Sequence, residues 1–63
     1  MKRIFTAKFF RLSPRDQAPI VEAELRDIEQ YYGRFTSPAD ERRARRRAAR
    51  IRKMAVRYGI LSE

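Results

Sequence analysis

The sequence contains no cysteine and no histidine among its 63 residues. Without cysteine, neither a disulfide framework nor a thiolate metal site can supplement a small core, and a reducing, cytoplasmic setting is expected. Without histidine, the chain lacks the usual metal ligand and the usual general base of catalysis. We therefore predict that it has no bound metal, no cofactor, no small-molecule substrate and no enzymatic activity.

Long apolar runs are also missing, since none exceeds three residues and a membrane-spanning helix needs roughly 20. The basic start, Met1 to Arg3, is not followed by the apolar stretch of a secretory signal. Residues 1–63 are expected to form one small domain, and a domain near this size buries only about 60% of the surface that its unfolded chain exposes. We therefore predict no membrane partner, and dimerisation to complete the small core.

Acidic residues are in short supply relative to basic ones. The chain has 16 lysines and arginines against 8 aspartates and glutamates, a formal charge of +8. Most of the cations are arginine, whose planar guanidinium suits phosphate and carboxylate. A surplus this large in so short a chain predicts an anionic partner.

A Ser-Pro-x-Asp pattern occurs twice, at residues 13–16 and 37–40, and is typical of a helix N-terminus. The serine accepts a hydrogen bond from a free amide, proline suits the first helical position, and aspartate meets the positive end of the helix dipole. Because Pro19 would fall inside a helix begun at Pro14, we predict a single turn there and a new start near Pro19. Gly33 is expected to end this helix, which gives it the range 19–34.

Apolar residues recur at helical spacing after Pro19 and again after Ser37. The first set is Val21, Leu25, Ile28, Tyr32 and Phe35. The second set is Ala44, Ala48, Ile51, Ala55 and Tyr58. The second pattern predicts a basic helix over 37–58, closed by Gly59 in the left-handed conformation. Two helices with a short connection should pack as an antiparallel hairpin, so the predicted fold is mostly α.

Residues 1–12 form an aromatic segment, which we expect to cover the C-terminal end of the second helix. The side chains expected to do so are Ile4, Phe5, Phe9, Phe10 and Leu12. Phe5, Phe9 and Leu12 fit a helical stripe, whereas Phe5, Ala7 and Phe9 fit an alternating strand, so helix and strand both stay open. The small number of β-branched residues favours a helix.

The order of a short N-terminal segment, an acid-flanked helix and a basic helix is similar to that of ribbon-helix-helix repressors. That resemblance covers the layout of about the first 58 residues. It implies a dimer with paired N-terminal strands, in which Lys2, Thr6 and Lys8 would face a DNA groove. The second helix departs from the family pattern, because it is more basic and has fewer large apolar residues.

Placing successive residues about 100° apart sorts the cations of the second helix by direction. Three arginines flank the apolar seam and are expected to pair with glutamates across the hairpin: Arg45, Arg47 and Arg52. Their expected partners on the first helix are Glu22, Glu24 and Glu29. The other six cations share an arc about 100° wide in which we expect no acid. We call this arc the basic face, and its members are Arg42, Arg43, Arg46, Arg50, Lys53 and Arg57.

Like charges four residues apart, such as Arg42 and Arg46, each cost a few tenths of a kcal/mol, so the basic face is expected to meet counter-charge from outside. We predict a regulatory protein that binds the phosphates of DNA or RNA with little sequence specificity, because asparagine, which reads adenine, is absent. Secondary contacts are expected from Lys2, Lys8, Arg11 and Tyr31.

The alternative is a small helical modulator or inhibitor, of the kind that phages and mobile elements encode. It would lay the same helix on an acidic surface of another protein. Tyr31, Tyr32 and Phe35 at the hairpin turn fit this alternative, because tyrosine and arginine are common in binding hot spots. A component of a ribonucleoprotein is a third reading, and binding to a membrane surface is the least favoured.

Overall fold

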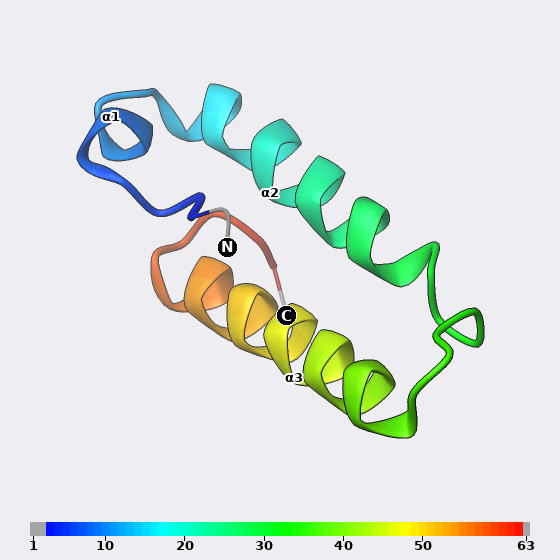
Figure 1. The fold of residues 1–63 in the computed structure, drawn as a ribbon. Helices are drawn as coiled ribbons and strands as arrows, with labels where there is room; N and C mark the ends of the chain where they lie inside the picture. The colour runs from blue at the N-terminus through cyan, green and yellow to red at the C-terminus, as the bar shows by residue number, and fades with distance from the viewer. Residues whose placement is uncertain (1–2, 63) are drawn as a thin grey trace.

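The computed structural model describes residues 3–62, which form three helices: α1 (Ala7–Phe10), α2 (Pro14–Glu29) and α3 (Pro38–Arg57). Helices α2 and α3 lie side by side and run in opposite directions, and α1 lies at the end of the hairpin where α3 finishes (Figure 1). The predicted mostly helical fold with an antiparallel hairpin is confirmed. No strand occurs within residues 3–62, and residue 2, a predicted groove-facing lysine, lies outside the described range.

Helix α2 corrects the predicted range of 19–34, because it starts at Pro14 and continues through Pro19. The backbone carbonyl of Ser13 accepts the N–H groups of Asp16 and Gln17, each at 2.9 Å. The prediction that the Ser13 hydroxyl accepts a backbone N–H is wrong. This hydroxyl instead donates to Asp16 Oδ2 at 3.2 Å. Proline in the second turn removes one backbone hydrogen bond, and the packing of the rest of α2 outweighs this local cost.

The end of α2 also differs from the prediction, since the helix stops at Glu29 rather than at residue 34. The chain tightens into turns, in which the N–H of Tyr32 donates to the Glu29 carbonyl at 3.1 Å. Gly33 then has a φ of 81°, in the left-handed region that favours glycine. Both carboxylate oxygens of Glu41, in the first turn of α3, accept the Gly33 N–H at 3.1 Å. An acid of α3 therefore holds the loop that precedes it.

Helix α3 has both of its predicted ends. The Ser37 hydroxyl accepts the Ala39 N–H at 3.2 Å, with proline at the next position. At the other end Gly59 has a φ of 76°, its N–H donates to the Val56 carbonyl at 3.0 Å, and the Ile60 N–H donates to the Ala55 carbonyl at 2.8 Å. This pair of bonds is the Schellman arrangement, which directs the chain back over the helix it has just left.

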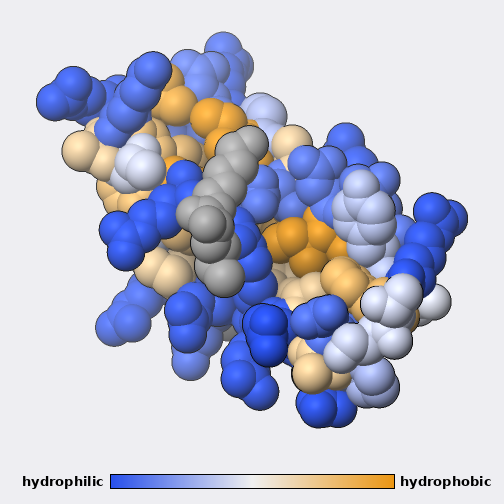
Figure 2. All heavy atoms as spheres, in the orientation of Figure 1, coloured by the Kyte–Doolittle hydropathy of each residue, from blue (hydrophilic) through white to orange (hydrophobic). Residues whose placement is uncertain are grey.

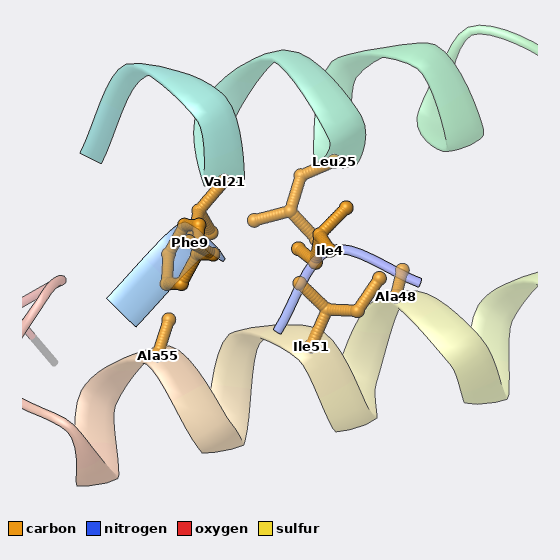
Figure 3. Packing of buried hydrophobic residues seen from close by; sticks show 7 residues of the cluster. All are labelled: Ile4, Phe9, Val21, Leu25, Ala48, Ile51 and Ala55. Carbon is orange, nitrogen blue, oxygen red and sulfur yellow. The ribbon is translucent and has the colours of Figure 1, made fainter. Parts of the chain in front are cut away.

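The core forms where the two apolar seams meet. Figure 3 shows side chains of α2 and α3 pointing toward one another, with two side chains of the N-terminal segment among them. Its buried members are Ile4, Phe9, Val21, Leu25, Ala48, Ile51 and Ala55. Because α3 contributes two alanines, its backbone can approach α2 closely.

Three residues that were expected to pack inside remain partly exposed. Phe10 and Leu12, predicted to cover the end of α3, keep 46% and 36% of their surface exposed, and Tyr58 at the end of its seam keeps 47%. For Phe10 the reason is the shortness of α1, which is a single turn and can direct only one of its faces inward. Phe9 occupies that inward position and is 4% exposed.

Gln17 is a polar residue of the interior that the apolar periodicity did not indicate. It is only 8% exposed, and its Nε2 donates to the Leu12 carbonyl at 2.9 Å and to the Phe9 carbonyl at 3.3 Å. The Phe9 carbonyl lies in α1 and also accepts the Leu12 N–H at 3.1 Å, whereas the Leu12 carbonyl lies two residues beyond the helix. Gln17 thereby ties α1 to α2.

Candidate nucleic-acid interface

Two of the arginines that flank the seam of α3 pair with α2 as predicted. Arg47 Nη2 lies 3.0 Å from Glu24 Oε1, and Arg52 Nη2 lies 2.8 Å from Glu29 Oε2. The first pair is mostly buried, with 23% and 13% of the two side chains exposed, whereas the second is open to solvent at 54% and 42%. These cations serve the contact between the helices and belong to the hairpin itself.

Arg45, the third flanking arginine, corrects the prediction that it pairs with α2. Its guanidinium binds Glu41 of its own helix, with Nη2 3.1 Å from Oε1, and also lies 4.1 Å from the centroid of the Tyr32 ring. A glutamate four residues earlier on the same helix face is closer than any acid across the hairpin. Glu41 therefore joins the Gly33 loop to Arg45.

The basic face is exposed at all six of its positions. Arg43 corrects the expectation that no acid lies beside this face, because its Nη1 is 3.6 Å from Asp40 Oδ1. Aspartate in the first turn of α3 reaches it through the i, i+3 spacing, and both side chains are at least half exposed, so the attraction is weak. Within residues 3–62 the remaining five cations have no ion-pair partner.

Charge is divided unequally between the two long helices. Helix α2 contains five acids and two bases, a net charge of −3, while α3 contains two acids and nine bases, a net charge of +7. Hydrophilic side chains project along the edge of the molecule that α3 forms (Figure 2). The fold therefore collects its positive charge on one side.

A groove of about 420 Å³ borders the basic face at Arg50 and runs between α3 and the N-terminal segment. Arg3, Phe5 and Met54 are among its walls. Past its Phe5 wall, three rings form a cluster whose centroids lie 5.1 to 6.3 Å apart. We call this cluster the aromatic platform, and its members are Phe5, Phe10 and Tyr58.

Sequence reasoning missed the aromatic platform as a surface, because it assigned all three rings to packing. One signal was present: Phe10 lies outside the helical stripe of Phe5, Phe9 and Leu12, so a helical N-terminal segment leaves it pointing elsewhere.

The predicted secondary contacts occupy separate places. Lys8 and Arg11 are exposed on α1 and at its C-cap, close in sequence to the aromatic platform, and Lys2 lies outside the described residues. Tyr31 is 53% exposed at the hairpin turn and shares a hollow with Glu24 and Asp27. Arg47 also lines this hollow and pairs with Glu24. Because Asp27 leaves the hollow with a net negative charge that would repel phosphate, we leave Tyr31 out of the candidate interface.

Two negative findings apply to the described part of the chain. Residues 3–62 contain no group of three or more acidic side chains placed to hold a metal ion. None of the helices in this range is long and apolar enough to cross a membrane.

The chain was also compared with known proteins. No protein-family model, curated protein or solved structure matches it.

Proposed function

We propose that this protein binds nucleic acid, contacting the phosphates of DNA or RNA through the basic face, and that it acts as a regulator rather than as an enzyme. The observation that carries the proposal is the contrast between two groups of cations on one helix. The flanking arginines have carboxylate partners, whereas five exposed cations of the basic face have none within residues 3–62. Phosphates would supply the missing negative charge.

The length of α3 suits a linear polyanion. Its 20 residues span about 30 Å at ~1.5 Å per residue, and cations recur along this length from residue 42 to residue 57. Each phosphate that a cation neutralises releases condensed counterions, which favours binding at low salt.

Sequence specificity is expected to be low. Hydrogen bonds to base edges discriminate sequence, whereas contacts with phosphates do not. Among the amide side chains that read adenine, the chain has no asparagine, Gln17 is buried, and Gln30 caps α2 away from the basic face.

The test replaces three cations of the basic face together, as Arg46→Gln, Arg50→Gln and Lys53→Gln. Binding to labelled single-stranded and duplex oligonucleotides is measured by fluorescence anisotropy over a salt series. We expect weaker binding, and a slope of log K against log salt that is shallower by about 2 to 3, because each lost phosphate contact removes about 0.7 to 0.9. Circular dichroism should show an unchanged fold, since these side chains are exposed.

The matched control removes the same amount of charge elsewhere, as Arg15→Gln, Arg26→Gln and Arg34→Gln. These arginines are exposed but lie outside α3, so the control should retain most of the affinity and the original slope. Equal losses in the two variants would mean that net charge, and not the basic face, drives binding. Absence of binding at micromolar protein, or binding that is insensitive to salt, would overturn the proposal.

A second candidate function is supported by a groove of about 580 Å³ between α2 and α3. Tyr32, Ala48 and Val56 provide apolar lining, and Arg52 and Lys53 contribute cations. An amphipathic helix with acidic flanks on another protein would fit this composition, and binding it would make the chain a modulator of that protein. The absence of nucleic-acid binding in the salt titration would favour this candidate.

We also propose that the chain self-associates. Its core is small for an independently stable fold, and Leu12 and Ile20 remain 36% and 39% exposed. A second copy would bury apolar surface that the monomer leaves in water.

A further inference from the structure

The aromatic platform packs on a buried ring. Phe9, which is 4% exposed, lies 5.4 Å from Phe5 and 5.3 Å from Phe10, measured between ring centroids. The Phe10 and Tyr58 rings meet edge to face at 5.1 Å, and Phe5 completes the cluster at 6.3 Å and 5.6 Å from them. The buried Phe9 ring therefore supports Phe5 and Phe10, and the Tyr58 ring packs against these two.

Two rings of the platform are nearly half exposed, which is costly for side chains of this size. Phe10 keeps 46% and Tyr58 47% of its surface in solvent. Aromatic side chains contribute most to stability when they are buried, so a chain with so small a core gains little from holding two of them at the surface. Their arrangement is better explained by contact with a ligand.

The platform adjoins the basic face. Tyr58 directly follows Arg57 at the end of α3, and Phe5 lines the same groove as Arg50. Lys8 and Arg11 are exposed on the neighbouring α1 segment. A ligand for this end of the molecule must therefore offer flat apolar faces and negative charge together.

We propose that the aromatic platform stacks unpaired nucleobases, so that the partner is a single strand whose phosphates lie on the basic face. This inference rests on the proposed function and narrows it. A base presents a flat face of any sequence to an aromatic ring, and its own phosphate lies within reach of a neighbouring cation. In a duplex the base faces are stacked on one another, so the platform gains nothing from them.

Neither ring faces nor guanidinium groups distinguish ribose from deoxyribose. Oligo(dT) is therefore a suitable probe, and its bases have little stacking of their own to lose. The comparison ligand is a duplex with the same number of phosphates, which tests the basic face without offering free bases.

The first experiment places a reporter in the platform. The chain contains no tryptophan, so Phe10→Trp introduces a single indole while keeping an aromatic face at this position. Tyr31→Trp is the matched control, because Tyr31 is also exposed but lies at the hairpin turn beside Glu24 and Asp27. We expect oligo(dT) to quench the indole at position 10 strongly, the saturating duplex to leave it nearly unchanged, and the indole at position 31 to respond to neither.

The second experiment removes the ring but keeps apolar volume, as Phe10→Leu and Tyr58→Leu. Affinity for oligo(dT) should fall roughly fivefold or more in each variant, while affinity for the duplex should stay within about twofold. Circular dichroism checks that the fold is retained. If either leucine variant unfolds, the tryptophan reporter decides alone, because it keeps an aromatic side chain in the cluster.

The outcomes separate this inference from the proposed function. If oligo(dT) and the duplex quench the reporter equally, or if the leucine variants bind oligo(dT) as tightly as the original chain, the stacking role is wrong while phosphate binding stands. If neither ligand binds the original chain, both proposals fall together. Selective quenching with selective loss of single-strand affinity supports the stacking role.

Discussion

The arginines of α3 have different roles according to the direction in which each side chain leaves the helix. Arg47 reaches Glu24 in a contact from which solvent is largely excluded, and Arg52 reaches Glu29 at the surface. Removing one partner of a pair that is shielded from water leaves the other charge unpaired where solvent cannot reach it, which is costly. Removing one partner of an exposed pair costs little, because solvent screens exposed charges.

Replacement of the two α2 glutamates should therefore have unequal effects. We expect Glu24→Gln to lower the free energy of unfolding by about 1 to 3 kcal/mol, since it removes a charge-assisted bond from a mostly buried arginine. Glu29→Gln should cost only about 0.2 to 1 kcal/mol, because its pair is about half exposed. Urea denaturation followed by circular dichroism measures both values.

Glu22→Gln is the control for this comparison, because Glu22 is an exposed glutamate of the same helix. Its effect should stay within about 0.5 kcal/mol. Equal costs for Glu24→Gln and Glu29→Gln would show that burial of the first pair has no energetic consequence.

At this scale, sequence reasoning predicted the pairs that depend on helical periodicity. The angular position of Arg47 and Arg52 around α3 determines which side of α2 each one meets, and the pairing of both with glutamates of α2 was predicted, although no individual partner was assigned. The partners of Arg43 and Arg45 were not predicted. Each is an acid of the same helix, three or four residues earlier, whereas the prediction considered ion-pair partners only on the other helix. Attention to i, i+3 and i, i+4 neighbours would have found both.

Among the helices, α2 shows how packing overrides a local signal. Pro19 cannot donate a backbone hydrogen bond, and it normally interrupts a helix. Here Val21 and Leu25 follow it in the core, and Gln17 before it is buried and bonded to the end of α1. Contacts on both sides of the proline hold the turn in helical form.

Pro19→Ala should therefore stabilise the protein. An interior proline is about 3 kcal/mol less favourable than alanine, and the greater freedom of the unfolded alanine chain returns up to ~1 kcal/mol. We expect a net gain of about 1 to 2 kcal/mol, seen as a higher midpoint in thermal unfolding. Pro38→Ala is the matched control, because proline at the first position of α3 lacks only an N–H that would have no helical partner.

The control should lose about 0.4 to 1 kcal/mol, since it adds freedom to the unfolded chain without restoring a bond. A loss of stability on Pro19→Ala as well would indicate that the helix is interrupted at this residue.

The start and end of a helix could be predicted from the sequence where neighbouring residues set them, but not where contacts with distant residues do. Both boundaries of α3 are set by residues next to the helix: Ser37 caps its start, and Gly59 follows its end. Both were predicted. Helix α1 depends partly on a local cap and partly on a contact with α2 that no local pattern reveals. Thr6 Oγ1 accepts the Phe9 N–H at 3.2 Å, and Gln17 binds the carbonyls at the far end, so the choice between helix and strand was open in the sequence.

The whole molecule has a small core and an excess of charge of one sign, and these two properties bear on self-association in opposite ways. Apolar surface left in water favours a second copy, while repulsion between basic faces opposes contact through α3. Self-association should therefore strengthen as salt is raised, as nucleic-acid binding weakens.

Sedimentation velocity at micromolar concentrations tests this expectation. We expect a sedimentation coefficient that rises with protein concentration and a thermal midpoint that rises with it, because mass action stabilises an associated fold. A single monomeric species whose thermal midpoint is independent of concentration would contradict self-association.

The opposite net charges of α2 and α3 also give the molecule an electric dipole directed across the hairpin. In the field of a long polyanion such a body rotates as it diffuses, so that α3 is already turned inward at first collision. A large share of encounters would then lead to binding, and added salt would lower the association rate as well as the affinity. The negative side, facing away, would discourage a second strand from wrapping around the same copy.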